Sequence, residues 1–270
     1  MHHLNCGTFC PAGSGRLGRV TGLRELVCHC LLIETSEGLV LVDSGFGSRD
    51  VDRPMRIGPA LRFLGRPSLS HSETALFQVR SLGFRSADVR HIVLTHLDPD
   101  HAGALQDFPN ASVHIRRAEF EAAHSPTTRM ERSRYRPQNW AHGPKWSLVD
   151  DRGEDWQGFA GVTALEGLPP EILMVPLPGH SRGHVGLAVQ GENGWLLHAG
   201  DAFFSRRELE GGTTGVVLTR QQRALAVDLG AWERTRDALC RLHARADDGA
   251  VFCAHDGEQL ERLRAASHMA

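Results

Sequence analysis

Histidines and aspartates stand close together directly after a short apolar run in the middle of the chain. His96, Asp98, Asp100 and His101 fall within six residues, immediately after Ile92-Val93-Leu94. Side chains two apart on an extended chain point to the same side, so the first His and Asp can bind one ion. The second Asp and His follow where the chain turns, and they can reach another ion. Buried carboxylates this close would repel each other without a cation, so the pattern predicts a metal site.

Three later segments have the same form, an apolar run followed by a polar residue beside a turn. The polar residues are His180, Asp201 and His255. Catalytic sites are usually built this way, because the ends of strands on a rigid sheet hold the ligands while loops shape the pocket. We therefore expect these three residues to join the first four at one site.

The composition is that of an ordinary globular chain, long enough at 270 residues for one large domain. The formal net charge of −2 gives no electrostatic reason to expect nucleic acid or an anionic membrane as a partner. The sixteen histidines are unusual, since imidazole is the commonest metal ligand and a proton shuttle near neutral pH.

The six cysteines are too sparse for a disulfide scaffold. No basic segment followed by an apolar run begins the chain, and no stretch approaches the roughly 20 apolar residues of a spanning helix. We therefore expect a cytoplasmic protein without a signal peptide. Cys6, Cys10, Cys28 and Cys30 could form a separate zinc site, but Cys28 and Cys30 lie in an apolar strand, which favours buried free thiols.

Apolar runs separated by turn residues predict strands in both halves of the chain. The expected strands cover residues 26–34, 39–43, 92–94, 112–115, 172–176, 185–189, 195–198 and 250–253. Helical spacing predicts helices over 72–82 and from 219 to about 244. Together these elements predict two sheets packed face to face with helices outside, in a single domain over residues 1–270.

Residues 117–150 form a long polar segment of weak periodicity between the two groups of strands. Insertions of this kind are often lids or substrate-facing elements, so the segment is a candidate cap for the active site. Trp140 and Trp146, with Arg134 and Arg136, either line the mouth of the pocket or pack as a helical cap.

The combined pattern resembles the metallo-β-lactamase superfamily, whose signature is His-x-His-x-Asp-His followed by a Gly-His turn, a Gly-Asp and a late His. The resemblance spans nearly the whole chain. Thr95 before the motif, Ala102-Gly103 after it and residues 179–184 look most like the lactonase branch, of the N-acyl homoserine lactonase type. The resemblance implies an α/β fold, the αββα four-layer sandwich, and a metal-dependent hydrolase.

Carried over position by position, the resemblance implies two divalent ions. His96, Asp98 and His180 would hold the first ion, Asp100, His101 and His255 would hold the second, and Asp201 would bridge them. Ions about 3.5–4 Å apart can share a hydroxide, which would attack a substrate carbonyl or phosphorus. In the family the residue at the position of Asp100 also orients this nucleophile, which implies a catalytic role for Asp100.

Two positions depart from the family pattern. Asp98 stands where the family has its second His, and a carboxylate is a harder, more anionic ligand, so iron or manganese becomes an alternative to zinc. Relatives that cleave homoserine lactones carry a Tyr three residues after the bridging Asp, where this chain has Phe204. The single Tyr of the chain is Tyr135, in the insertion. Phe204 is the candidate substrate contact, and its identity weakens the lactone assignment but not the hydrolase assignment.

The expected substrate is a small molecule with an ester-like bond, a lactone first and a thioester, as in glyoxalase-II-like relatives, second. A phosphodiester comes third, because a nuclease would be expected to show a basic surface. Flavodiiron-type oxygen reduction would need a flavin-binding domain that this chain lacks. A metal-binding protein of the same fold without activity is the non-enzyme alternative, and a homodimer is left open.

Four further polar residues lie near the predicted site. His184 is expected to pack behind His180, and His198 to be a hydrogen-bonded core histidine. Asp43 either orients a ligand through a hydrogen bond or simply forms a turn. Arg182 either contacts an anionic substrate or is a solvated loop charge.

Overall fold

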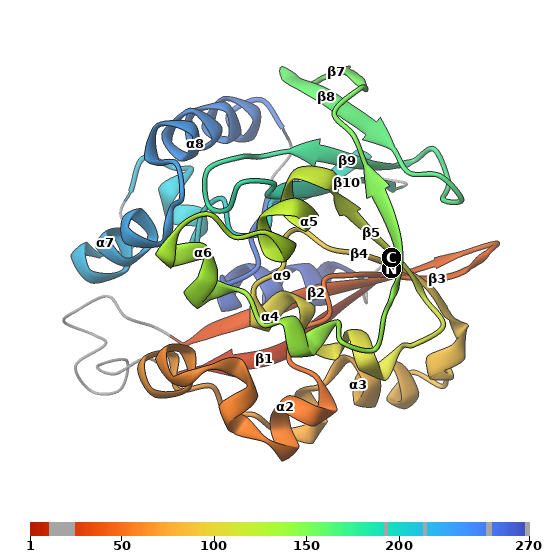
Figure 1. The fold of residues 1–270 in the computed structure, drawn as a ribbon. Helices are drawn as coiled ribbons and strands as arrows, with labels where there is room; N and C mark the ends of the chain where they lie inside the picture. The colour runs from red at the N-terminus through yellow and green to blue at the C-terminus, as the bar shows by residue number, and fades with distance from the viewer. Residues whose placement is uncertain (11–24, 192–193, 213–214, 247–249, 268–270) are drawn as a thin grey trace.

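The computed structural model describes residues 1–10, 25–191, 194–212, 215–246 and 250–267, which form two six-stranded sheets (Figure 1). The first sheet contains β1 (His2–Phe9), β2 (Leu26–Thr35), β3 (Gly38–Val42), β4 (Val89–Val93), β5 (Ser112–Arg116) and β6 (Lys145–Val149), in that order. The second contains β12 (Val251–Phe252), β11 (Gly194–His198), β10 (Val185–Gly191), β9 (Ile172–Pro176), β8 (Phe159–Ala164) and β7 (Glu154–Trp156), in that order.

The strand register brings the ends of several strands to one edge of the sandwich. In the first sheet, β3 to β6 are parallel, and Val42 pairs with Val93, so the segments after β3 and β4 leave the sheet side by side. In the second sheet, β11 and β12 are parallel, with His198 opposite Phe252. Asp201 lies three residues after His198, and His255 lies three residues after Phe252. Because the strands are parallel, the turns that carry these two residues lie at the same edge of the sheet.

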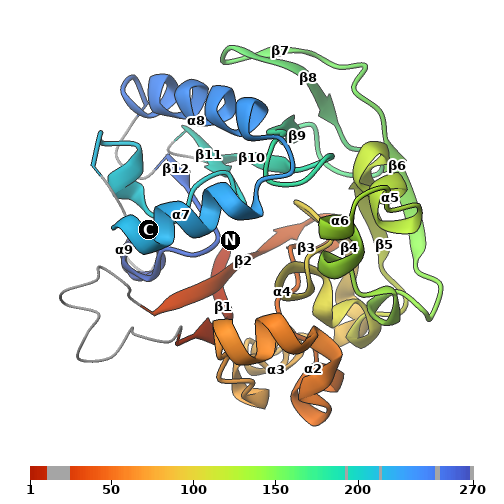
Figure 2. The ribbon, with the colours of Figure 1, turned by 60° about the vertical axis from the view of Figure 1, so that its left-hand side comes forward.

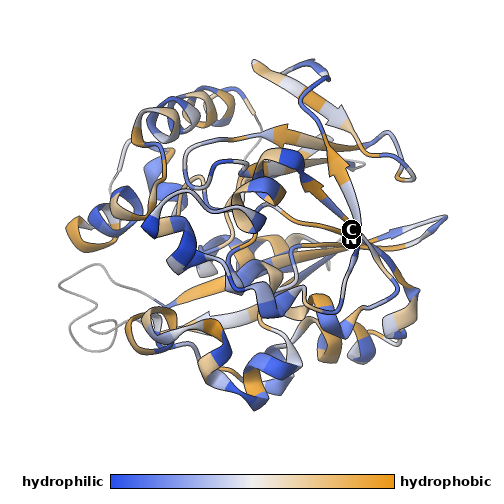
Figure 3. Cartoon of the chain, in the orientation of Figure 1, coloured by the Kyte–Doolittle hydropathy of each residue, from blue (hydrophilic) through white to orange (hydrophobic). Residues whose placement is uncertain are grey.

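Three hydrophobic clusters define the layers. One cluster lies between the two sheets and includes Leu31 and Ile33 of β2. A second cluster lies between the first sheet and its helices and includes Leu32, because successive side chains of a strand point to opposite faces. The third cluster lies between the second sheet and α8 (Leu229–His243) and contains Leu239 and Leu242. Helix, sheet, sheet and helix therefore form four layers, which confirms the predicted sandwich. Figure 3 shows largely hydrophobic strands at the centre and helices of mixed hydropathy outside.

Within the described residues, the remaining α-helices are α2 (Ser48–Asp52), α3 (Ala75–Ser81), α4 (Pro99–Ala102), α5 (Arg117–His124), α6 (Arg129–Arg134), α7 (Val216–Leu225) and α9 (Gly257–Ser267). Helix α3 begins where Thr74 accepts a hydrogen bond from the amide of Phe77, and it buries Ala75 and Val79 against the first sheet. No helix among the described residues is both long enough and apolar enough to cross a bilayer.

The helix predicted from 219 to about 244 is wrong in one respect, because two helices occupy this stretch. Helix α7 ends at Leu225 and α8 begins at Leu229. Between them the amides of Val227 and Asp228 donate to the carbonyl of Gly179, and the Asp228 carboxylate caps α8 by accepting from the amide of Ala231. A contact with a distant loop therefore replaces the helical hydrogen bonds at this point.

The segment 117–150 is partly integrated into the sandwich. It contains α5, α6 and β6, and β6 extends the first sheet by pairing with β5. Helix α6 lies near α4 and α7 (Figures 1 and 2). The sequence-based prediction missed β6, as it missed β1, β7 and β8.

Candidate metal centre

A change of backbone conformation after β4 splits the first four predicted ligands into two pairs. Asp98 is still extended, with φ −67° and ψ 152°, and Pro99 then begins α4. Pro is favoured at the first position of a helix because its missing amide would have no partner there. Asp100 and His101 thus lie on α4, where the His101 ring comes within 4.1 Å of the His96 ring, measured between centroids.

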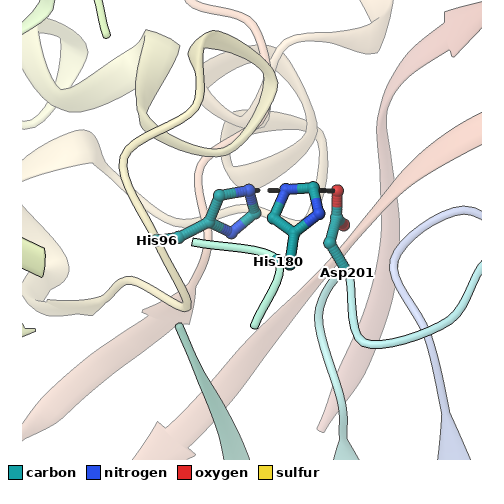
Figure 4. A group of neighbouring side chains, drawn as sticks. All are labelled: His96, His180 and Asp201. Atoms are coloured by element: carbon teal, nitrogen blue, oxygen red, sulfur yellow. Dashed lines mark ion pairs between the residues drawn. The ribbon is translucent and has the colours of Figure 1, made fainter. Parts of the chain in front are cut away.

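All seven predicted ligands converge at one edge of the sheets. Two groups of three side chains offer ligand atoms within 4.8 Å of one another, and both groups are buried. The first group is His96, His180 and Asp201 (Figure 4), and the second is Asp100, His101 and His255. Asp98 lies beside the first group, with its Oδ2 3.4 Å from Nε2 of His96 and 3.3 Å from Nε2 of His180.

The Asp201 carboxylate, a member of the first group, also lies close to the histidines of the second. Its Oδ1 is 3.2 Å from Nε2 of His101 and 3.1 Å from Nε2 of His255, both in the second group. Its Oδ2 is 3.5 Å from Nε2 of His180 and 3.9 Å from Nε2 of His96, in the first group. Oδ2 also lies 3.1 Å from Nε2 of His255, so the one carboxylate contacts histidines of both groups.

The donor set fits divalent metal ions. Nε2 of His96, Nε2 of His101 and Oδ1 of Asp201 are buried and, although ion-pair contacts surround them, make no hydrogen bond of normal geometry. Buried polar atoms normally find a hydrogen-bond partner, and those that do not call for an explanation such as an ion. Imidazole nitrogens and carboxylate oxygens are ligands for zinc, iron and manganese.

Outer hydrogen bonds fix the orientation of the histidine rings. Asp43 Oδ2 lies 2.8 Å from Nδ1 of His101 and also accepts from the hydroxyl of Thr95. The carbonyl of Val27 lies 2.7 Å from Nδ1 of His255. These contacts turn the Nε2 atom of each ring toward the centre, as outer partners commonly do for metal-binding histidines. Asp43 thus orients a candidate ligand, one of the two roles considered for it.

His184 and His198 behave as their sequence positions suggested. His184 Nε2 accepts a hydrogen bond from the amide of Asp201, 2.9 Å away, and its ring lies 5.7 Å from that of His180. His198 is buried, with Nε2 2.7 Å from the carbonyl of His29. Both residues support the site or the core without facing the ligand groups.

Burial and close charges shift the pKa values of the ligands strongly in the metal-free protein. Burial would raise the pKa of Asp201, but His255 and His101 hold it well below its usual range. Burial also opposes ionisation of Asp98, yet Arg134 and His96 keep its pKa well below the usual value. For His180, burial and then Arg134 lower the pKa to about 4. The neutral imidazole and the charged carboxylates are the states that bind metal.

The family model for the metallo-beta-lactamase superfamily matches residues 23–255, most of the chain. This chain belongs to the metallo-beta-lactamase superfamily. A probable metallo-hydrolase of Mycobacterium tuberculosis is 42% identical to it over 267 residues, covering 98% of this chain and 82% of the relative.

Lactonases are also among the proteins similar to this superfamily member. The N-acyl homoserine lactonase AttM of Rhizobium johnstonii is 30% identical over 192 residues, covering 70% of each chain. A crystal structure of a Bacillus thuringiensis AiiA variant with N-decanoyl-L-homoserine bound at its active site matches with a TM-score of 0.71. That match covers 97% of this chain and 94% of the other at 20% identity, so it concerns the shared fold.

In this metallo-beta-lactamase superfamily chain, a pocket of about 250 Å³ opens onto the ligand groups. Its polar floor includes carboxylates and imidazoles of both groups, and its walls are largely apolar. The apolar wall residues include Ile57, Leu61, Leu64, Met130, Phe204 and Leu225. The ring of Phe204 packs edge-on against that of His255, with 4.6 Å between centroids.

The insertion contributes to this pocket through α6 rather than through its tryptophans. Met130, Ser133 and Arg134 of α6 line the pocket, as does Arg136. Trp140 instead lies in the hydrophobic cluster beside the first sheet, and Trp146 packs against that cluster. The two arginines therefore line the pocket, which was the first alternative. The two tryptophans pack against the core instead, which was the second.

Three other residues singled out from the sequence have contacts that settle their surroundings. The Arg182 side chain is 38% exposed and pairs with Glu131 at 2.6 Å, so it is a partly solvated loop charge, and it does not line the pocket. Tyr135 is buried, and its hydroxyl donates to Glu119. Cys6 is a buried free thiol, as are the two cysteines of β2, and the metal-binding groups among the described residues contain no cysteine.

Sequence reasoning missed Glu119 altogether and did not foresee the contact between Arg134 and Asp98. Glu119 is fully buried on α5 and accepts hydrogen bonds from the loops on either side of the ligand groups. Its neighbours on the chain, in the run Arg117-Ala118-Glu119-Phe120, carry no recognisable motif. Both roles arise only when distant segments are brought together.

Proposed function

We propose that this protein is a dinuclear metal-dependent hydrolase that cleaves a small ester-like bond, with a lactone as its substrate. One observation carries the proposal, namely that the Asp201 carboxylate lies within 3.5 Å of histidines of both groups. A carboxylate in that position can be shared by two ions. The two ions are proposed to be zinc, with iron or manganese as alternatives because of Asp98.

The proposed roles follow from the two groups. His96, Asp98 and His180 would hold one ion, Asp100, His101 and His255 would hold the other, and Asp201 would contribute to both. Bound divalent ions would acidify a water molecule and polarise the carbonyl group under attack. The residues supply the orientation, because the histidines are fixed by their outer hydrogen bonds before any substrate arrives.

Asp100 is proposed to move the proton. It lines the pocket, and its Oδ2 is 3.6 Å from Nε2 of His101 and 3.7 Å from Nε2 of His255. Burial raises the pKa of Asp100, although both imidazoles oppose the rise. A carboxylate with a raised pKa is suited to take a proton from the attacking water and return it to the leaving oxygen.

The lactone assignment rests on the relatives and on the pocket. Two of the similar proteins described above are an N-acyl homoserine lactonase and a lactonase fold solved with an acyl-homoserine. The apolar walls formed by Leu61, Leu64 and Met130 suit a substrate with an apolar chain next to the bond that is cleaved. We further propose that α6, as one wall of the pocket, partly caps the bound substrate.

A hydrolysis screen on zinc-loaded protein tests this proposal. The panel holds N-acyl homoserine lactones, acyl thioesters and a phosphodiester, and the readout is proton release. We expect turnover of lactones and its loss by several orders of magnitude in Asp201→Asn. The control is Asp237→Asn, an exposed aspartate on α8, which should retain full activity.

Turnover of thioesters alone would reassign the substrate to the glyoxalase-II-like class. Lactone turnover that survives Asp201→Asn would contradict the shared-carboxylate mechanism. A zinc-loaded protein that hydrolyses no member of the panel would favour a metal-binding role without hydrolysis.

A further inference from the structure

The carboxylate of Asp98 has its two oxygens directed at different partners. Oδ2 lies near Nε2 of His96 and Nε2 of His180, at 3.4 and 3.3 Å. Oδ1 lies 3.5 Å from Nε of Arg134, a residue at the end of α6 in the insertion. Both side chains are enclosed, that of Arg134 being 4% exposed and that of Asp98 15% exposed.

Arg134 is held in place by the two carbonyl groups on either side of this contact. One terminal nitrogen, Nη1, donates to the carbonyl of His180 at 2.9 Å, and Nη2 donates to the carbonyl of Leu225 at 2.5 Å. The guanidinium therefore connects α6 with the His180 loop and with the end of α7. Its position does not depend on Asp98 alone.

The charges at this site explain why a guanidinium is needed. Asp98, Asp100 and Asp201 bring three largely buried carboxylates together, with side chains 15%, 11% and 4% exposed. Among the described residues, Arg134 is the one arginine or lysine within 4.0 Å of these carboxylates. A neutral imidazole at position 98 would bring one negative charge fewer. Asp98 adds that charge, and Arg134 adds one positive charge within ion-pair distance.

We propose that Arg134 is the positioning counter-cation of Asp98, so that the two residues together take the place of a single neutral ligand. The guanidinium faces Oδ1 at ion-pair distance without a hydrogen bond, while Oδ2 faces the two imidazoles. It also keeps the net charge of the ligand cluster at the value that a neutral ligand would give. This inference rests on the proposed metal site, but the pairing itself is a property of the metal-free protein.

The stability lost on replacing Arg134 distinguishes a purely structural role from that of a counter-cation. If its contacts with the carbonyls of His180 and Leu225 were its whole role, its loss would cost the same stability whatever residue stands at position 98. If it neutralises Asp98, removal of either partner leaves one buried charge unpaired, whereas removal of both does not. The effects of the two substitutions would then be far from additive.

A double-mutant cycle separates these two roles. The variants are Arg134→Met, Asp98→Asn and the double variant, with Asp98→His and its double variant as a second cycle. The melting temperature of the metal-free protein and the zinc dissociation constant, from competition with a chelator, are measured for each. Arg132→Met is the matched control, because Arg132 lies on the same helix and is exposed.

We expect each single substitution to lower the melting temperature and the double variants to recover part of the loss. Asp98→His alone should weaken zinc binding about tenfold or more, because Arg134 would face the incoming ion without its carboxylate. Adding Arg134→Met should restore most of that affinity, and Arg132→Met should change neither quantity.

Additive effects in both cycles would overturn the proposal and leave Arg134 a purely structural residue. The metal count of the unsubstituted protein distinguishes this failure from failure of the proposed function. Two ions with additive cycles would remove only the pairing of Asp98 with Arg134. No bound ion would remove the proposed function, and the melting temperatures of the metal-free variants would still decide whether the pair exists.

Discussion

Asp43 shows how a single backbone conformation orients a candidate metal ligand. Its φ is +53°, a left-handed value that few residues adopt readily but that Asp and Asn tolerate. In this conformation its Oδ1 accepts from the amide of Thr95, and its Oδ2 lies against Nδ1 of His101. Burial opposes ionisation of Asp43, but His101 keeps its pKa below the usual value. The same backbone conformation of Asp43 therefore forms the turn and places its carboxylate against His101.

Asp43→Asn tests this role without disturbing the turn, because Asn accepts the same backbone conformation. We expect zinc affinity to fall by about 10- to 100-fold, the usual cost of losing such a supporting carboxylate. Chelator competition measures it, with Asp52→Asn, an exposed aspartate, as the control. Unchanged affinity in Asp43→Asn would reduce Asp43 to a turn residue.

The individual ligands could be proposed from sequence because each follows an apolar run at a short, regular distance. His96 and Asp98 were recognisable from their spacing alone, and Asp201 and His255 from the turns that carry them. Arg134 gave no comparable signal, since its partner lies thirty-six positions earlier in the chain. Its contact with Asp98 depends on how α6 packs, which no local pattern encodes.

At the scale of elements, Glu119 connects α5 to both loops that carry the first group of ligands. Its Oε1 accepts from the amide of Leu97 and the hydroxyl of Tyr135, each at 3.1 Å. Its Oε2 accepts from the hydroxyl of Ser181 at 2.6 Å and the amide of Gly183 at 3.0 Å. Four donors thus satisfy one buried carboxylate, which fixes the two loops relative to each other.

Glu119→Gln should loosen this connection, because its amide group would present hydrogens to at least some of the four donors. We expect a loss of about 1–3 kcal/mol in the free energy of unfolding, the usual cost of an unsatisfied buried group. Tyr135→Phe removes one donor and should cost about 1 kcal/mol. Urea unfolding measures both, and equal stability of Glu119→Gln and the unsubstituted protein would contradict the role.

The break between α7 and α8 illustrates what element prediction lacks. Residues 219–244 look like one helix because nothing in their spacing interrupts the periodicity. The interruption comes from Gly179, whose carbonyl takes hydrogen bonds from Val227 and Asp228. The strands were easier to predict, since β3, β4 and β9 to β11 are short apolar runs with turn residues at their ends.

At the scale of the whole molecule, the buried histidines outside the metal centre link folding to pH. His114 on β5 is 2% exposed, and its Nε2 lies 3.0 Å from Nδ1 of His91. Burial, with a smaller contribution from His91, lowers the pKa of His114 from 6.5 to about 4. The unfolded chain therefore takes up this proton at a higher pH than the folded protein, so the stability from His114 is complete above pH 6.5 and is lost as the pH falls toward 4.

From these pKa values, protonation linked to His114 should lower the free energy of unfolding by about 2 kcal/mol when the pH falls from 8 to 5. In His114→Gln this contribution disappears, so the variant should lose less stability over the same interval. Urea unfolding of the metal-free protein at both pH values measures the difference. An identical pH dependence in the two proteins would show that His114 does not titrate on unfolding.

The fold of the whole molecule was predictable because two groups of strands, with helices between and after them, leave few other ways to bury their apolar faces. The path of residues 117–150 was not. Half of that segment joins the first sheet as β6 or packs beside it, and α6 turns back to the pocket. Its placement depends on buried polar contacts, such as that of Arg134, rather than on any periodicity.

The central claim is that seven side chains form one site for two ions, and the metal content of the purified protein tests it most directly. Elemental analysis after zinc loading and removal of unbound metal should give close to two ions per chain, and close to one or fewer in Asp201→Asn. The same count in both proteins, or no zinc in the unsubstituted protein, would contradict the account.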